Sequence, residues 1–221
     1  DSDLFAAGSQ AKYEAARAAG FFRDEILPIE VAQGRKQTVR VEADEHPRPD
    51  SSLEKLAALR PLFEGGVVTA GNASGVNDGA GALLLGSLEA GEKAGVKPRG
   101  RVVATAVAGV QPRVMGLGPV PASQKALARA GLSLKDMDII EINEAFATQV
   151  LGCLKLLEIP FDDTRVNPNG GAIAVGHPLG ASGARIALSS LRQLERTGGR
   201  YALISMCIGV GQGIAAVIER V

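Results

Sequence analysis

Three turns of this sequence, two of them rich in glycine, each follow a predicted strand and carry one side chain that can take part in the chemistry of a carbonyl group. His177 lies among small residues in the segment 169–183, and Cys207 follows an apolar run and precedes the glycine turn 209–213. Asn143 comes directly after another apolar run. Imidazole and thiol groups can exchange protons near neutral pH, and a glycine turn can aim amide N–H groups at a reacting carbonyl. These turns are therefore candidate sites for chemistry on a carbonyl group.

Most of these residues also have a purely structural interpretation. Asn143 is a favoured N-cap, and Glu144 suits the first turn of a helix. A free cysteine such as Cys207 is usually a small buried hydrophobic residue. His177 is poorly explained as core filling, because its neighbours are small and rich in glycine. The other cysteine, Cys153, lies among apolar residues in the middle of a predicted helix and is expected in the core.

The elements that must hold these turns alternate between helix and strand. Helices are predicted over 2–19, 52–59, 89–94, 123–130, 143–157 and 183–197, and strands over 25–31, 38–41, 67–70, 101–109, 139–142, 201–206 and 214–219. Gln33-Gly34-Arg35 predicts an irregular hairpin between the first two strands, and Ser123 is expected to cap its helix. Helices that alternate with apolar strands indicate a layered α/β domain.

Composition excludes several other classes of protein. The 221 residues carry 24 Lys and Arg against 24 Asp and Glu, and this zero net charge argues against a nucleic-acid partner. No apolar run reaches the roughly 18–20 residues that cross a bilayer, and the first residues lack the pattern of a signal peptide. We therefore expect a cytosolic protein without a membrane contact. The two cysteines and two histidines lack the spacing of a zinc site, so no metal is expected, and His46 is assigned to the surface.

Taken together, the turns resemble the C-terminal half of thiolases. The segments Asn-Glu-Ala-Phe-Ala (143–147), Asn-Gly-Gly-Ala-Ile-Ala-Val-Gly-His-Pro (169–178) and Cys-Ile-Gly-Val-Gly (207–211) match that family in order and separation. The segments 69–80 and 114–119 also look like thiolase sequence. The resemblance implies an acyltransferase that cleaves a 3-oxoacyl-CoA with CoA into acetyl-CoA and a shortened acyl-CoA.

The fold that the resemblance implies is a thiolase-like layered α/β/α fold. Residues 1–76 are then the remainder of a loop domain, 77–100 complete a missing N-terminal half, and 101–221 form the C-terminal domain around a mixed five-stranded sheet. That N-terminal half, with the acyl-accepting cysteine, is largely absent from the sequence. We therefore expect this C-terminal portion to be inactive alone and to expose an apolar face.

The catalytic roles implied by the resemblance fall on four residues. Cys207 matches the cysteine that removes or returns the α-proton of acetyl-CoA, a role for which a nearby cation or turn amides can lower a thiol pKa toward neutrality. His177 matches the histidine that activates the missing nucleophilic cysteine and polarises the thioester oxygen. Asn143 matches the residue that holds a water beside that histidine. The N–H of Gly209 matches a donor to the tetrahedral intermediate.

Coenzyme A is implied as a substrate, with no covalently bound cofactor. Ser74 matches a contact of the pantetheine arm, and Met115, Ala145 and Phe146 match the apolar wall of its tunnel. Arg48 lies where relatives place an arginine near the adenine nucleotide, although it also reads as a solvated surface charge. The implied partners are acyl-CoA and CoA, with a homodimer or homotetramer as the assembly.

Substrate choice rests on three segments, 46–49, 115–121 and 206–213, which look most like thiolases that cleave 3-oxoadipyl-CoA to succinyl-CoA in bacterial breakdown of aromatic compounds. Acetoacetyl-CoA is the alternative substrate. Ketoacyl synthases are the nearest alternative enzymes, but the glycine turn after Cys207 favours thiolase. A non-catalytic CoA-binding or subunit fragment is the alternative from another class.

Overall fold

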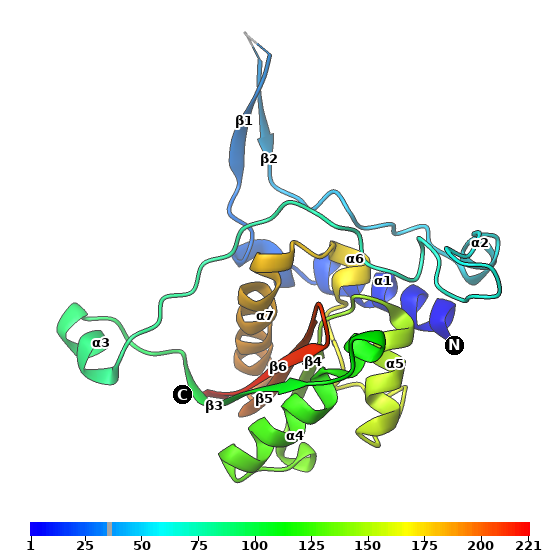
Figure 1. Cartoon of the computed structure of the whole chain (residues 1–221). Helices are drawn as coiled ribbons and strands as arrows, with labels where there is room; N and C mark the ends of the chain where they lie inside the picture. The colour runs from blue at the N-terminus through cyan, green and yellow to red at the C-terminus, as the bar shows by residue number, and fades with distance from the viewer. Residues whose placement is uncertain (35–36) are drawn as a thin grey trace.

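The computed structural model describes residues 1–34 and 37–221 (Figure 1). Its helices are α1 (Ser2–Ala18), α2 (Leu53–Ala57), α3 (Leu88–Ala94), α4 (Pro119–Ala130), α5 (Ala147–Leu156), α6 (Ala172–Val175) and α7 (Ser182–Thr197). Its strands are β1 (Ile29–Gln33), β2 (Gln37–Val41), β3 (Gly100–Gly109), β4 (Ile139–Ile142), β5 (Tyr201–Ile208) and β6 (Gln212–Arg220). The 3-10 turns are η1 (Phe21–Asp24), η2 (Pro112–Leu117), η3 (Leu134–Asp136) and η4 (Leu179–Ala181).

The central sheet has the order β3-β6-β5-β4, in which β4 runs parallel to β5 and the other pairs are antiparallel. The expected sheet of five strands is thus wrong for the described part of 101–221, which forms four. The fifth position is reduced to one parallel bridge between Ile140 and Val166. Asn167, at φ 42°, turns the chain away there, and the following Pro168 has no N–H to continue a ladder.

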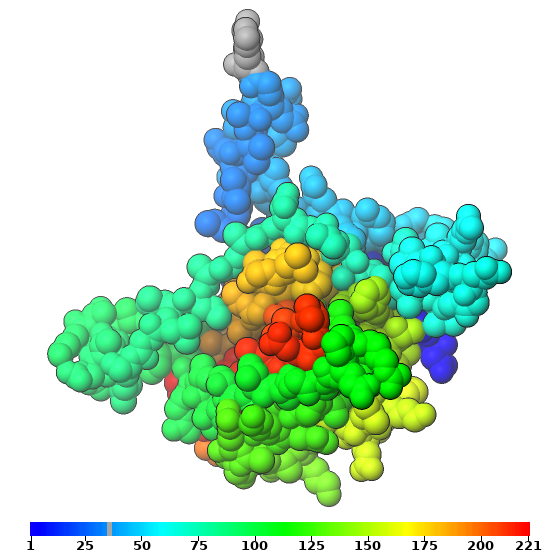
Figure 2. Space-filling model, in the orientation of Figure 1, coloured from blue at the N-terminus to red at the C-terminus, as the bar shows by residue number. Residues whose placement is uncertain are grey.

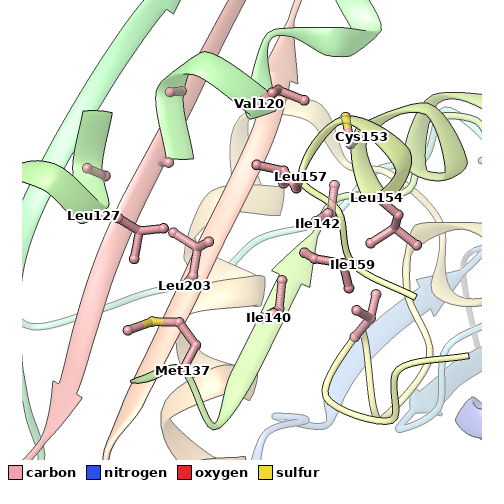
Figure 3. Packing of buried hydrophobic residues seen from close by; sticks show 14 of the residues in the cluster. Val120, Leu127, Met137, Ile140, Ile142, Cys153, Leu154, Leu157, Ile159 and Leu203 are labelled. Carbon is pink, nitrogen blue, oxygen red and sulfur yellow. The ribbon is translucent and has the colours of Figure 1, made fainter. Parts of the chain in front are cut away.

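The sheet lies between two helical layers. Ile140, Ile142 and Leu203 face α4 and α5 and form the main core with them (Figure 3). Ile139 and Ile204 alternate to the opposite face, where α7 covers them. Because successive strand residues point to opposite faces, the apolar strands are buried on both sides. The layered α/β/α arrangement is confirmed.

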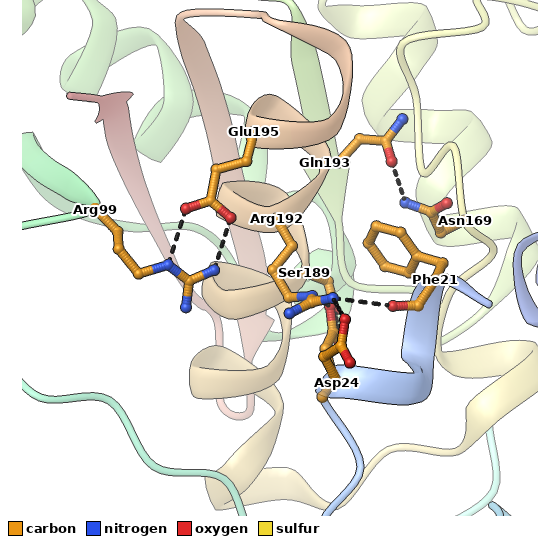
Figure 4. A network of polar contacts seen from close by, with 9 residues as sticks. Phe21, Asp24, Arg99, Asn169, Ser189, Arg192, Gln193 and Glu195 are labelled. Atoms are coloured by element: carbon orange, nitrogen blue, oxygen red, sulfur yellow. Dashed lines mark hydrogen bonds and ion pairs between the residues drawn. The ribbon is translucent and has the colours of Figure 1, made fainter.

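The N-terminal helix is fastened to α7 by polar contacts (Figure 4). Arg192 donates to Asp24 Oδ2 at 3.1 Å and to the Phe21 carbonyl at 3.4 Å. Nearby, Ser189 donates to Glu25 at 2.9 Å. These bonds fix the end of α1 and the η1 turn against the helix that begins at Ser182.

The segments outside the layers are extended and exposed. The β1–β2 hairpin and the arm that carries α3 project from the body (Figure 2). The hairpin strands pair as expected, from Ile29 with Val41 to Gln33 with Gln37; Arg35, expected in the turn, lies outside the described residues. Within 1–34 and 37–221, no helix combines the length and apolar character needed to span a membrane.

Four predicted elements differ from the structure by more than two residues. The strand predicted over 25–31 begins only at Ile29. Residues 67–70 form no strand, because no other strand runs beside them. The helix predicted from Ser123 begins at Pro119, whose fixed φ suits a first turn, and Ser123 is buried within it. The helix predicted from Asn143 begins at Ala147. Asn143 is therefore not its N-cap.

Candidate functional site

Asn143 lies just beyond the end of β4, in backbone that continues beside β5. Its N–H donates to the Ser205 carbonyl at 2.9 Å, and its side chain is almost completely buried. Since the parallel neighbour β5 runs on to Ile208, this bond places Asn143 at the edge of the sheet where Cys207 also lies.

His177 follows α6, and both of its ring nitrogens have partners. Nδ1 lies 2.6 Å from Ser182 Oγ, and Nε2 lies 3.3 Å from Asn143 Nδ2. Asn143 Oδ1 is buried and has no partner in the described part of the chain. A carboxamide can donate to a bare Nε2 through its nitrogen, or accept from a protonated Nε2 through its oxygen. The pair can therefore serve an imidazole that alternates between base and donor, and the unpaired Oδ1 can accept a hydrogen bond from a water.

The His177 ring is neutral at neutral pH. Burial lowers the pKa of His177, and the charge of Arg185 lowers it further. A neutral imidazole is the form that can accept a proton.

The loop that carries His177 is anchored by a buried carboxylate. Glu144 accepts hydrogen bonds from Ser9 Oγ at 2.7 Å, from Asn167 Nδ2 at 2.8 Å and from the Ile173 N–H at 3.1 Å. Ser9 Oγ in turn accepts from the Gly171 N–H at 3.0 Å. Glu144 was interpreted from the sequence only as a first-turn residue, and Ser9 and Ser182 were missed. For Ser182, the one signal in the sequence for a contact with His177 was its position five residues later.

Cys207 stands at the end of β5, opposite Gly213 on β6. Strand alternation places its side chain on the face of Leu203, which α4 and α5 cover, whereas Asn143 alternates toward the α7 face. The end of β5 nevertheless lies close to the start of α7, because a Cβ on Gly183 would lie 4.0 Å from the Met206 methyl. Convergence of Cys207 and His177 on one pocket stays a prediction.

The surroundings of Cys207 act on its pKa mainly through burial. Burial raises the pKa of this thiol, and a hydrogen bond with its own backbone opposes the increase less strongly. The acid–base role of Cys207 stays a prediction.

The chain after Cys207 forms a tight hairpin turn between β5 and β6. Gly209 is exposed with open space where a Cβ would be, so the described chain gives no steric reason for glycine there. Val210 and Gly211 adopt φ values of 65° and 91°. Figure 2 shows this tip in red at the surface, between the orange region around α6 and the green region around η2.

The η2 turn supports that hairpin through backbone contact. A Cβ on Gly118 would overlap the backbone of Gln212, and one on Gly213 would overlap Gly118. Met115, in the same turn, is half-buried. The two glycines thus bring the turn that carries Met115 against the hairpin that carries Cys207.

Cys153 lies in the core, as expected. Its side chain is completely buried in the main cluster, its Sγ donates to the Gly116 carbonyl at 3.3 Å, and burial raises the pKa of its thiol to about 12. At neutral pH this sulfur is a protonated thiol, which is a poor nucleophile.

The residues expected to contact CoA fall into two groups. Ser74 Oγ donates to the Ala145 carbonyl at 3.2 Å, and residue 73 bridges to Phe146, so these side chains share one edge. Arg48 is exposed beside a hollow of about 270 Å³ that Leu56 and Leu59 also line. Its Nη1 turns back to the carbonyls of its own loop, at 2.6 Å from that of residue 46.

The structure therefore brings Asn143 and His177 into contact, and Ser74 together with Ala145 and Phe146. The β5–β6 hairpin carries Cys207 and Gly209, and the η2 turn that packs against it carries Met115. Arg48 lies apart from these residues. Among residues 1–34 and 37–221, no cluster of three or more His, Cys, Asp or Glu side chains could hold a metal ion.

Family models match almost the whole chain. The model described as "Thiolase, N-terminal domain" matches residues 1–89, and that described as "Thiolase, C-terminal domain" matches residues 96–220.

Curated relatives are similar along the full chain. A beta-ketoadipyl-CoA thiolase from Pseudomonas aeruginosa is 58% identical over 222 residues, which cover 100% of this chain and 55% of the relative. A 3-oxoadipyl-CoA/3-oxo-5,6-dehydrosuberyl-CoA thiolase from Escherichia coli is 54% identical with the same coverage. The chain thus spans about half the length of the curated relatives it matches.

Solved structures share the fold. An acetyl-CoA acetyltransferase from Bacillus anthracis superposes with a TM-score of 0.95 at 44% identity, over 100% of this chain and 55% of that one. Human mitochondrial 3-ketoacyl-CoA thiolase in complex with CoA superposes with a TM-score of 0.88 at 47% identity, over 100% of this chain and 54% of that one.

Proposed function

The chain belongs to the thiolase family, and from this membership we propose that it is the part of a thiolase that supplies the histidine, the acid–base cysteine and the CoA contacts for cleavage of a 3-oxoacyl-CoA. The observation that carries the proposal is the hydrogen-bonded line from Ser182 through His177 to Asn143. Such a line holds an imidazole in one orientation, with Nε2 beside the Asn143 amide nitrogen. The other amide atom, the buried Oδ1, has no partner in the described part of the chain.

Cleavage needs a nucleophile that this chain does not provide, and we assign it to the remaining part of the enzyme. His177 accepts the proton of that thiol, and the thiolate then attacks the 3-oxo carbon to form a tetrahedral oxyanion. The Gly209 N–H donates to that oxyanion. Collapse breaks the carbon–carbon bond and leaves the acyl group on the nucleophile and the electron pair on acetyl-CoA as an enolate.

Cys207 then protonates that enolate to release acetyl-CoA. The protonated state that burial favours for this thiol is the one that the cleavage direction requires. Protonated His177 and the water held by Asn143 stabilise the negative thioester oxygen meanwhile. The CoA thiol then gives its proton to the Cys207 thiolate, and the CoA sulfur attacks the acyl carbon. The bond to the nucleophilic sulfur breaks, and that thiolate takes its proton back from His177, which restores all three groups.

The proposed substrate is 3-oxoadipyl-CoA, which is cleaved with CoA to succinyl-CoA and acetyl-CoA. The names of the Pseudomonas aeruginosa and Escherichia coli relatives support this choice. The Bacillus anthracis neighbour supports acetoacetyl-CoA as the second candidate. We place Ser74, Ala145, Phe146 and Met115 along the pantetheine arm of CoA, and Arg48 at its nucleotide end.

The proposed assembly is a homodimer or homotetramer in the cytosol. The β1–β2 hairpin supports self-association, because Ile29, Val31 and Val41 are exposed on it. Both cysteines are free, which fits a reducing compartment.

The test is thiolysis by the enzyme completed with its N-terminal portion. We expect faster cleavage of 3-oxoadipyl-CoA than of acetoacetyl-CoA, and loss of at least about 100-fold in kcat on His177→Ala. Equal activity of His177→Ala would refute the catalytic assignment. Preference for acetoacetyl-CoA would replace the substrate, and CoA binding without turnover would favour a non-catalytic fragment.

A further inference from the structure

The peptide that carries His177 is held by residues that lie about a hundred positions earlier in the chain. The His177 N–H donates to the Gly75 carbonyl at 3.0 Å and to Asn77 Oδ1 at 3.3 Å. Val76 and His177 form an isolated parallel bridge. Residues 75–77 therefore lie beside His177 as a neighbouring strand would.

Asn77 also occupies the space left by a missing side chain. Gly176 adopts a φ of 92°, and a Cβ on it would overlap the carboxamide of Asn77. The glycine turn before His177 and the Asn77 side chain thus fit against each other, and the direction in which the chain enters His177 depends on both.

The His46 ring contacts the Asn77 carboxamide from the other side. Its Nδ1 lies 3.5 Å from Asn77 Nδ2, and a Cβ on Gly75 would lie 2.5 Å from its Cε1. Burial, followed by the charge of Arg48, lowers the pKa of His46, while a backbone hydrogen bond with Ile173 raises it. The neutral ring offers a lone pair to Asn77 Nδ2. The sequence-based assignment of His46 to the surface is wrong, since its ring is half-buried.

We propose that Asn77, held by the His46 ring, is a positioning residue for His177. Asn77 fixes the peptide between Gly176 and His177, and that peptide fixes the imidazole between Ser182 and Asn143. Neither Asn77 nor His46 needs to touch a substrate in this role. The catalytic meaning of the proposal rests on the proposed function of His177, but the positioning itself does not.

The chain has only two histidines, His46 and His177, so histidine-selective ¹⁵N labelling gives two ring spectra that a His46→Gln variant assigns. In the native 221-residue chain we expect His177 to show one neutral tautomer, because each ring nitrogen has its own partner. In Asn77→Ala we expect loss of that single-tautomer signature, with the two nitrogen shifts moving toward their average. A His177 spectrum unchanged in a folded Asn77→Ala chain would overturn the proposal.

Two further variants separate the contacts. Asn77→Asp keeps the Oδ1 that accepts from the His177 N–H but removes the donor to His46. The His46 signals should therefore change, and the His177 tautomers should average less than in Asn77→Ala. Asp78→Ala, an exposed change in the same segment, should alter neither ring. A His177 spectrum that changes equally in Asp78→Ala would contradict a specific role for Asn77.

If Asn77→Ala does not fold, His46→Ala decides the question, because it leaves Asn77 in place and removes only the ring behind it. Averaging of the His177 tautomers in that variant supports the proposal, and a native His177 spectrum overturns it. The readout uses no acyl-CoA, so failure of thiolysis in the completed enzyme would refute the proposed function without changing this result.

Discussion

Glu141 is a buried acid on the face of β4 that α7 covers. Only 3% of the residue is exposed, and burial raises its pKa to about 8, an effect that the charge of Arg185 opposes. The folded chain thus keeps a proton on Glu141 at neutral pH that the unfolded chain releases. A group whose pKa is higher in the folded state stabilises fully below the unfolded value of 4.5, and that contribution is lost as the pH rises through about 8.

Replacing Glu141 by glutamine should therefore stabilise the chain more at high pH than at low pH. We expect Glu141→Gln to raise the Tm at pH 8.5, relative to the native chain, by at least about 2 °C more than at pH 5. Thermal unfolding followed by circular dichroism at both pH values measures this. Glu92→Gln, an exposed change on α3, is the control and should show no such trend; a pH-independent effect of Glu141→Gln would contradict the buried, protonated state.

The loop between Gly171 and His177 is the element on which the candidate site depends. Its start is closed by contact with Glu144, because a Cβ on Gly171 would overlap that carboxylate. Helix α1 reaches the same point through Ser9. A substitution at Gly171 should therefore disturb both helix α1 and the loop.

We expect Gly171→Ala to lower the free energy of unfolding by about 1–3 kcal/mol, because the added methyl group overpacks a buried, hydrogen-bonded contact. Equilibrium urea denaturation measures the change. Gly8→Ala provides the matched comparison on α1, where a Cβ would meet open space, and should stabilise by about 0.5–1 kcal/mol. Native stability of Gly171→Ala would show that Glu144 does not lock the loop.

The sequence predicted those elements whose signals are local. The amphipathic pattern defined α7, and apolar runs defined β3 to β6 closely. Residues 67–70 have strand-like composition but no partner strand, which no local pattern can reveal. Asn143 looked like an N-cap because its real backbone partner is also distant in the sequence: its N–H donates to the Ser205 carbonyl.

The candidate site was predictable where the family resemblance assigns a role to the residue itself. Asn143 and His177 were found in this way, and the structure brings them into contact. Ser9 and Asn77 were not found, because each acts through a hydrogen bond to a residue at least 100 positions away. The direction of the Cys207 pKa could not be predicted from the sequence, because it is set by burial, which depends on the whole fold.

At the scale of the whole molecule, the arm before α3 leaves apolar side chains without cover. Val76, Leu84 and Leu85 are 82%, 89% and 73% exposed. Monomeric proteins seldom expose contiguous apolar patches larger than a few hundred Å². The chain spans only 55% of its Pseudomonas aeruginosa relative.

The 221-residue chain alone should therefore self-associate and bind a hydrophobic dye. We expect Leu84→Ser combined with Leu85→Ser to reduce both dye fluorescence and the fraction of large species in sedimentation velocity. Leu4→Ser, at an exposed position of α1 away from the arm, should change neither. A native chain that sediments as one small species without dye binding would contradict this account of the arm.

The bonds that hold the histidine loop span long stretches of sequence: 135 residues between Ser9 and Glu144, 162 between Ser9 and Gly171, and 100 between Asn77 and His177. Closing such loops costs entropy before any contact compensates for it, so helices and hairpins form earlier than this site. On the ribosome, none of the bonds to the loop can exist until residue 171 and those after it have emerged. The growing chain can therefore form its helices one after another, but the bonds that fix the His177 loop form only after residues 9, 77, 144 and 171–177 have all left the ribosome.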